Sequence, residues 1–236
     1  MTELAAPTLV GGTPRLLPFG DRALLMEVDT LEQALALYPA LRAASIPGIT
    51  DLVPAARSIL VSIDPRMLSL HAARTWALSV RPGVVAASTS ELVHIDVTYD
   101  GDDLAHVAGT LGITTDDLVA WHTSTSWSVA FIGFAPGFAY LSAATGSGRH
   151  SASGGGGLDV PRRATSRPVV PAGSVGLAGE FSGIYPRSSP GGWQLIGRTD
   201  AVLWDETRAN PALLAPGARV QFRAVEGRRL GYGLSQ

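Results

Sequence analysis

The side chains in this sequence that are best suited to chemistry are arginines held between prolines and glycines. Arg162 and Arg167 lie in the run 161–176, which also contains three prolines, and Arg198 lies further along the chain. Arginine can bind a carboxylate or a phosphate through two parallel hydrogen bonds, and a proline-fixed backbone has less freedom to lose on binding. The run therefore predicts a site for a small anion. A solvated loop with surface arginines is the alternative.

Aromatic side chains accompany these arginines in two further runs. The run 131–141 places aromatic residues on both sides of a Pro-Gly pair, and the run 183–199 contains Tyr185 and Trp193. Both side chains combine an apolar ring with a polar atom, so they could line a pocket. The alternatives are a hairpin whose rings fill the core and a tight corner of a barrel. The loop positions expected to shape the site are Pro136, Gly137, Pro171, Gly173, Pro190, Gly191 and Gly192.

Groups that could act as an acid, a base or a nucleophile are few. His122 and Ser174 are the candidates for catalysis, although a lone histidine is more often structural. The histidines show no short metal-binding spacing, so no metal site is predicted. The chain contains no cysteine and no lysine, which excludes a thiolate nucleophile, a disulfide, a P-loop lysine and a Ser-Lys pair. We therefore expect the chain to act through partners or by binding alone.

The charge and the hydropathy of the chain exclude further classes of protein. The net charge is -2, with 18 arginines against 20 acidic residues, which argues against general affinity for nucleic acid. The longest apolar stretch, 129–141, is interrupted by glycine and proline and is shorter than the ~20 residues of a membrane helix. Residues 1–14 lack the pattern of a signal peptide. These observations predict a cytoplasmic protein that does not bind membranes.

Charged residues are distributed unevenly along the chain. Residues 91–117 contain seven acidic residues and no arginine, whereas residues 149–198 contain six arginines against two acidic residues, a local charge of +4. The basic stretch also holds the glycine- and proline-rich runs. This coincidence supports the prediction of an anion site in that part of the chain.

The first part of the chain is predicted to be a small α/β sandwich of the split βαβ kind. The predicted elements are strands over 23–28, 49–54 and 58–63, a helix that begins after Thr30, and a helix from Asp64-Pro65 to about Val80. The buried side of the last helix would consist of Met67, Leu68, His71 and Trp76. We expect a flexible N-terminus over 1–14, this α/β domain over 15–88, and a linker over 81–90.

The second part, 89–236, is predicted to be a β-barrel or a rolled sheet, which makes the fold class α+β. The predicted elements are strands over 91–99, 127–134, 174–178, 193–196, 201–204 and 219–225, and helices over 102–110 and 115–122. Short strands between frequent Gly/Pro turns are typical of barrels. The strand at 91–99 alternates polar and apolar residues, so we expect one of its faces to be solvated.

These motifs together resemble the KipI/PxpB family, whose members are also called the B subunit of 5-oxoprolinase or allophanate hydrolase subunit 1. The resemblance extends from about Leu17 to Phe222. It is carried by the runs 19–25, 53–61, 133–141, 161–176, 183–199 and 211–217.

The resemblance implies an N-terminal α/β domain, a cyclophilin-like β-barrel, and a carboxyltransferase-domain subunit that is inactive alone. The implied activity is that of the B subunit in an ATP-dependent 5-oxoprolinase, which opens 5-oxoproline to glutamate with an A subunit and a C subunit. The barrel of the C subunit would pair with this one. ATP is used by the complex, and this chain is expected to bind no cofactor. On matching motif positions, the residues implied in binding the anionic substrate are Arg162, Arg167, Tyr185, Trp193 and Arg198.

Two other roles in the same family remain open at this point. One is inhibition of a histidine kinase, which needs no catalytic group. The other is that of a carboxyltransferase subunit in allophanate hydrolase or urea carboxylase.

Two departures from the family pattern also stand out. Phe181-Ser182 replaces the usual Gln-Thr, which removes an amide that could contact substrate, and the segment 142–158 is unusually long and rich in glycine and serine.

Overall fold

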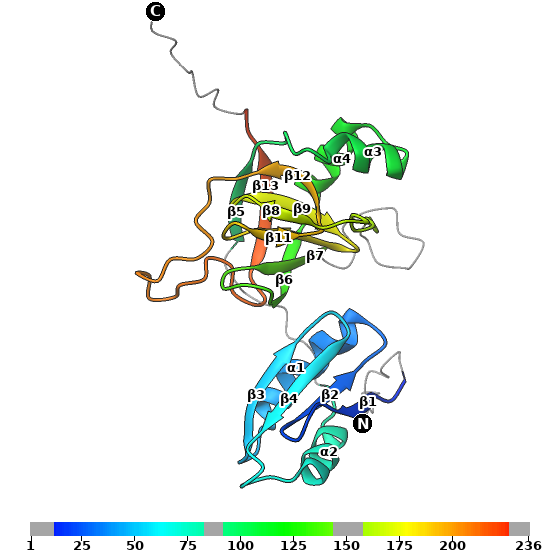
Figure 1. Ribbon diagram of the computed structural model, residues 1–236, viewed down its shortest axis with the longest axis vertical. Helices are drawn as coiled ribbons and strands as arrows, with labels where there is room; N and C mark the ends of the chain where they lie inside the picture. The colour runs from blue at the N-terminus through cyan, green and yellow to red at the C-terminus, as the bar shows by residue number, and fades with distance from the viewer. Residues whose placement is uncertain (1–11, 83–91, 144–157, 227–236) are drawn as a thin grey trace, which may run out of the picture. The chain divides into compact units, whose positions relative to one another are not determined.

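The computed structural model describes residues 12–82, 92–143 and 158–226 (Figure 1). The chain divides into two units, Met1–Ser88 and Thr89–Gln236, and each unit is described by itself. Several predictions fall partly or wholly outside the described residues: most of the flexible N-terminus, most of the linker over 81–90, and most of the glycine- and serine-rich loop over 142–158.

The N-terminal unit is a four-stranded antiparallel sheet with two helices packed on it (Figure 1). The strand order is β1-β2-β4-β3. The elements are β1 (Arg15–Pro18), β2 (Ala23–Glu27), α1 (Leu31–Ala43), β3 (Ile49–Pro54), β4 (Ser58–Ile63) and α2 (Leu70–Ser79). Every second residue along β4 is apolar and buried: Ile59, Val61 and Ile63. This alternation determines the face of the sheet on which the helices pack. Strand β1 was not predicted from the sequence.

The second helix of this unit begins later than the sequence predicted. Asp64 forms a turn in which its carboxylate accepts hydrogen bonds from the backbone and the guanidinium of Arg66, at 2.7 to 3.2 Å. The helix starts only after Ser69, whose hydroxyl caps it. Because of this shift Met67 is exposed and His71 lies on the solvent side, so their predicted burial was wrong, whereas Trp76 is buried as expected.

The C-terminal unit is a seven-stranded sheet that curls into a nearly closed barrel, with strand order β12-β9-β10-β7-β6-β13-β5 (Figure 1). The elements are β5 (Leu92–Val97), α3 (Leu104–Leu111), α4 (Thr115–Ser124), β6 (Trp127–Ile132), β7 (Ala139–Ala143), β8 (Arg167–Val170), β9 (Ser174–Ala178), β10 (Phe181–Ile184), β11 (Ser189–Gly191), β12 (Gln194–Arg198) and β13 (Arg219–Ala224). The barrel closes where Thr98, just after β5, exchanges two 2.9 Å backbone hydrogen bonds with Arg198 of β12. The predicted α+β class with a barrel is confirmed.

The predictions for this unit were wrong in two ways: one segment was predicted as a strand but is a loop, and some strands were not predicted. Residues 201–204 were predicted as a strand but form a loop, whose one ladder contact is an isolated bridge between Trp204 and Ala212. Conversely, β8 and β11, which contain Pro168 and Pro190, were not predicted as strands. They form a separate two-stranded sheet, and proline is tolerated in such edge strands. Strands β7 and β10 were also missed.

Candidate functional site

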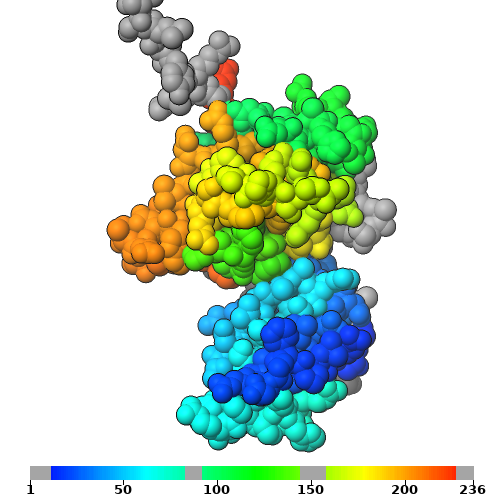
Figure 2. Space-filling view, in the orientation of Figure 1, coloured from blue at the N-terminus to red at the C-terminus, as the bar shows by residue number. Residues whose placement is uncertain are grey.

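The three predicted motif runs meet at one pocket in the C-terminal unit. The pocket has a volume of about 230 Å³, below the ~300–1,000 Å³ of sites for drug-sized ligands, so it suits a small molecule. Its lining residues are Phe134, Phe138, Tyr140, Arg162, Ser166, Tyr185, Pro190, Gly191, Gly192 and Trp193. In Figure 2 the segment that supplies Arg162 and Ser166, coloured yellow-green, lies on the visible face of this unit.

The walls of the pocket are aromatic rings that hold one another in place. Phe138 makes edge-to-face contacts with Tyr185 and with Trp193, each with ring centroids 5.3 Å apart, and Tyr140 lies 5.4 Å from Trp193 in the same kind of contact. Phe138, Tyr185 and Trp193 are buried. Such contacts restrict ring motion, so the cavity is preformed. The sequence left open whether these rings fill a core or line a pocket. They do both, because they belong to a small hydrophobic cluster and also line the cavity.

The predicted loop glycines give the backbone the shape that the pocket needs. A side-chain carbon on Gly191 would overlap the hydroxyl group of Tyr185, so only glycine lets this strand pass beneath the ring. Gly137 and Gly173 both have a φ of 80°, in the left-handed region that favours glycine. Pro136 precedes Gly137 in the turn that joins β6 to β7, and Pro171 begins the turn that leads into β9.

Arg162 is the cation of the pocket. It forms no ion pair with any acidic side chain in the described part of the chain. Burial raises the pKa of Tyr140 and of Tyr185. The charge of Arg162 partly opposes both shifts, and a backbone hydrogen bond from Trp193 and the charge of Arg167 also oppose that of Tyr185. Both tyrosines are therefore protonated near neutral pH and can donate hydrogen bonds. The pocket thus combines one positive charge, neutral hydroxyl groups and flat apolar walls.

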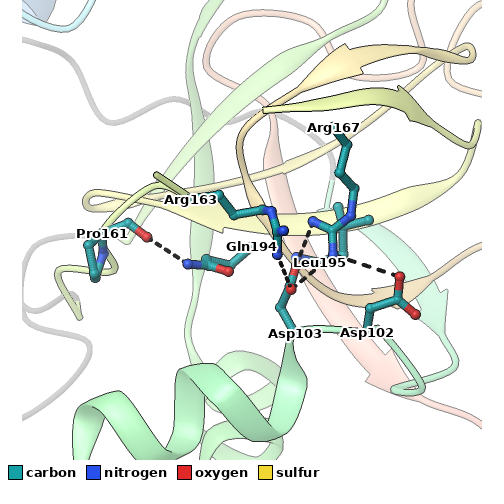
Figure 3. Close-up of polar contacts among 7 residues, drawn as sticks. All are labelled: Asp102, Asp103, Pro161, Arg163, Arg167, Gln194 and Leu195. Atoms are coloured by element: carbon teal, nitrogen blue, oxygen red, sulfur yellow. Dashed lines mark hydrogen bonds and ion pairs between the residues drawn. The ribbon is translucent and has the colours of Figure 1, made fainter. Parts of the chain in front are cut away.

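The other arginines with predicted roles are engaged elsewhere. Arg167 binds both oxygens of Asp103 at 2.9 Å, and Arg163 binds the same carboxylate at 2.8 Å (Figure 3). Arg198 pairs with Asp100 at 2.8 Å on the surface. The acidic and the basic stretches of the sequence therefore neutralise each other across the barrel end, and neither Arg167 nor Arg198 lines the pocket.

Asp103 is a buried carboxylate that sequence reasoning did not single out. Only 4% of its surface is exposed, and it also accepts a 2.7 Å hydrogen bond from the backbone N–H of Leu195 (Figure 3). Burial would raise its pKa, but hydrogen bonds from Arg167 and Leu195 and the nearby positive charges lower the pKa below its usual value. Asp103 is therefore ionised near neutral pH. The sequence did contain a signal for this residue: Asp103 stands just before a predicted helix, in an acidic stretch that has no arginine of its own to pair with.

The two candidates for catalysis lie outside the pocket. His122 is fully buried among barrel side chains, with Nδ1 2.6 Å from the Tyr99 hydroxyl, Nε2 2.8 Å from the Ser182 hydroxyl, and its ring stacked on Phe222. Burial lowers the pKa of His122 to about 3, so it is neutral. Ser174 is buried too, and its backbone carbonyl accepts a hydrogen bond from the backbone N–H of Tyr185.

The unusual Phe181-Ser182 pair serves the interior of the barrel. Ser182 has no exposed surface and supplies one of the two polar contacts of His122. Phe181 packs edge-to-face against Phe131 and Tyr140, and neither residue of the pair lines the pocket. The missing amide therefore does not change the pocket lining directly.

A larger hollow, of about 620 Å³, lies on the N-terminal unit, but none of the predicted binding residues lines it. Two of its lining residues, Arg15 and Glu27, neutralise each other at 2.8 Å. Among the described residues no three His, Asp or Glu side chains come together as a metal site would require. No helix in those residues is long and apolar enough to cross a membrane.

Comparison with known proteins places the chain in a family. A model of the carboxyltransferase domain, subdomains C and D, matches residues 14–214. The chain belongs to this family. It is 35% identical to the B subunit of 5-oxoprolinase from Escherichia coli O157:H7 over 211 residues, which cover 86% of this chain and 92% of that protein. It is 32% identical to the B subunit of 5-oxoprolinase from Bacillus subtilis strain 168 over 228 residues, 90% of each chain.

Two solved structures share this fold. The structure of TTHA0988 matches with a TM-score of 0.68 and 34% identity over 88% of this chain, which spans 41% of TTHA0988. The K. lactis urea amidolyase matches with a TM-score of 0.71 over 90% of this chain and 15% of that one, and at 19% identity it shows the fold alone. The family resemblance predicted from the motifs is confirmed.

Each of the ten described residues that line the pocket lies inside one of the family runs 133–141, 161–176 and 183–199. Of the five residues predicted to bind substrate, the structure brings Arg162, Tyr185 and Trp193 together. Phe134, Phe138, Tyr140 and Ser166 were missed as individual residues, although each lies inside a run that the sequence had marked. Their proximity depends on pairings between distant strands, which spacing along the chain does not reveal.

Proposed function

We propose that the chain is the B subunit of an ATP-dependent 5-oxoprolinase and acts with A and C subunits in the cytoplasm. The observation that carries this proposal is the 35% identity to a 5-oxoprolinase B subunit over 92% of that protein. The reaction would convert 5-oxoproline, ATP and water into glutamate, ADP and phosphate. We expect this chain to bind no ATP itself; it has no lysine and therefore no P-loop.

The pocket supports this proposal by its chemistry. The proposed substrate is a five-membered lactam that carries a carboxylate. Arg162 offers a charge-assisted hydrogen bond to that carboxylate, and the rings of Phe138 and Trp193 offer flat apolar surfaces to the substrate ring. The protonated hydroxyl group of Tyr185 could donate to the lactam oxygen. The ~230 Å³ volume suits a ligand of this size.

We assign binding and orientation to this chain rather than a complete set of catalytic groups. Among the described residues that line the pocket there is no histidine, aspartate or glutamate, so this part of the lining offers no side chain that commonly serves as a base near neutral pH. Attack of the lactam oxygen on the γ-phosphate of ATP, which releases ADP, and attack of water on the phosphorylated lactam, which releases phosphate, would therefore use groups of the A or C subunit. The chain alone is accordingly expected to be inactive.

The test is reconstitution of the complex. The chain is produced with the A and C subunits encoded beside it, and the loss of 5-oxoproline and the formation of ADP and glutamate are followed together. We expect ATP-dependent turnover with all three subunits and none when this chain is omitted. If no combination that contains this chain consumes 5-oxoproline, or if the A and C subunits are fully active without it, the proposal is wrong.

Two observations favour a second candidate, a carboxyltransferase subunit. The family model describes a carboxyltransferase domain, and a segment of 71 residues is 38% identical to the urea amidolyase of Lachancea kluyveri. In that case the partner would carry biotin, and the pocket would hold the acceptor of the carboxyl group. Transfer from a biotin-bearing partner, with no loss of 5-oxoproline, would support this candidate. The kinase-inhibitor hypothesis stays a prediction from sequence.

A further inference from the structure

The segment that carries Arg162 is fastened on both sides of that residue. On one side, the carbonyl of Pro161 accepts a 3.1 Å hydrogen bond from the amide group of Gln194 (Figure 3). On the other side, the backbone N–H of Arg163 donates to the carbonyl of Gly192 at 2.9 Å. Gly192 itself lines the pocket. The backbone of Arg162 is therefore held against the β11–β12 region that forms the floor of the pocket.

The side chains on this segment converge on one carboxylate. Arg163 Nη1 binds Asp103 at 2.8 Å, and the guanidinium of Arg167 binds both Asp103 oxygens at 2.9 Å (Figure 3). Together with the Leu195 N–H, Asp103 accepts four hydrogen bonds while only 4% exposed. Such charge-assisted bonds to a buried acceptor are short and directional. Asp103 therefore links α3 to both ends of the loop 163–167.

This arrangement also decides which arginine remains available. Arg163 and Arg167 share the charge of Asp103, and Arg167 lies 3.7 Å from a second carboxylate, that of Asp102. Two arginines against two carboxylates leave no net charge in this cluster. Among the described residues that line the pocket, Arg162 is the basic side chain. Asp103 itself does not line the pocket, so any effect it has on a ligand must pass through the loop.

We infer that Asp103 is a positioning residue: by clamping Arg163 and Arg167 it fixes the loop that presents Arg162 to an anionic ligand in the aromatic pocket. The inference rests on the proposed function in so far as that ligand is a small carboxylate. It adds a residue to which none of the family motifs assigns a role. Without the Asp103 charge, the loop loses its common anchor, and Arg163 and Arg167 are freed to compete with Arg162 for the anion.

A double-mutant cycle on the full chain tests the inference. The probe is pyrrole-2-carboxylate, a planar five-membered ring with a carboxylate, and its affinity is measured by titration calorimetry. Asp103→Asn keeps the shape of the side chain and removes its charge, Arg162→Gln removes the pocket cation, and the third variant carries both changes. The matched control is Asp100→Asn, which breaks the surface pair with Arg198 at the same end of the barrel. Melting temperatures show which variants are folded.

We expect Asp103→Asn to weaken probe binding about tenfold and Arg162→Gln to weaken it at least as much. In the Arg162→Gln background, Asp103→Asn should have little further effect, because Asp103 acts through Arg162. A purely structural role for Asp103 would give additive losses. The Asp100→Asn control should bind like the unmodified chain. If Asp103→Asn does not fold, Arg163→Met removes the same link from the loop side and should show the same coupling to Arg162.

The inference is overturned if Asp103→Asn binds as tightly as the unmodified chain, if its effect adds fully to that of Arg162→Gln, or if the unmodified chain binds no probe. These outcomes differ from failure of the proposed function. A reconstituted complex that does not consume 5-oxoproline would refute the proposed function, while coupling between Asp103 and Arg162 in probe binding would still establish the positioning role.

Discussion

Acid is expected to destabilise the C-terminal unit through one buried side chain, His122. Its ring is enclosed between the hydroxyl groups of Tyr99 and Ser182, and burial lowers its pKa from 6.5 to about 3. The unfolded chain therefore takes up a proton at a higher pH than the folded protein. The stability contributed by the neutral ring is complete above about pH 6.5 and is lost as the pH falls from there towards about pH 3.

The size of the loss follows from the same two pKa values. Each pH unit below the unfolded pKa costs about 1.4 kcal/mol until the folded pKa is reached. Between about pH 7 and about pH 4.5 the free energy of unfolding should fall by about 2 to 3 kcal/mol from His122 alone. The pKa of the Asp103 carboxyl group is lowered by folding from its ordinary value of 3.8, so paired carboxylates of this kind contribute mainly below that window. The window therefore isolates the histidine.

The assay is urea unfolding, followed by tryptophan fluorescence at a series of pH values in this window. The comparison is with His122→Gln, whose amide group does not titrate, so the contributions of all other groups cancel in the difference. We expect the unmodified chain to lose about 2 to 3 kcal/mol more than the variant between the two ends of the window. Equal losses in the two proteins would refute the description of His122 as a buried neutral residue.

Two further predictions concern the shape of the pocket. Gly191→Ala places a methyl group against the Tyr185 hydroxyl, so it should weaken binding of pyrrole-2-carboxylate about tenfold; unchanged affinity in calorimetry would contradict the close approach. Phe134 is 60% exposed and has a φ of 68°, a strained value for a side chain of its size. Phe134→Gly should therefore raise the free energy of unfolding by up to about 1 kcal/mol while weakening probe binding; Val169→Ala, at a position equally exposed but outside the pocket, should leave binding unchanged.

The charge pattern of the sequence indicated the part of the chain in which the site lies, but it did not indicate which charged residues pair with one another. Seven of the ten residues that line the pocket lie in the stretch 149–198, which the six arginines had singled out. The pattern could not show that Asp103 binds Arg163 and Arg167, because these residues lie about 60 positions apart and meet only when the barrel closes. Arg162 and Arg167 looked alike in the sequence, and the fold separates their roles.

The fold itself was predictable where local signals agree. The Thr30 cap and the alternation over 58–63 each predicted their element correctly, because burial and local preference point the same way. Strand β10 was missed because Gly183 weakens its local signal, and long-range pairing with β7 and β9 decides its conformation. The second helix begins later than predicted because the Asp64 carboxylate is bound by Arg66, and the hydroxyl of Ser69 caps the helix instead.

The central claim is that Arg162, in the aromatic pocket of this chain, binds the carboxylate of 5-oxoproline within a 5-oxoprolinase complex. The most direct measurement is kcat/KM for 5-oxoproline in the reconstituted complex with Arg162→Gln in this chain. Loss of a charge-assisted hydrogen bond predicts a decrease of about tenfold to a hundredfold. Arg223→Gln, which breaks an exposed pair with Asp96 on the same barrel, should leave the value unchanged. An Arg162→Gln complex as efficient as the unmodified one would contradict the account.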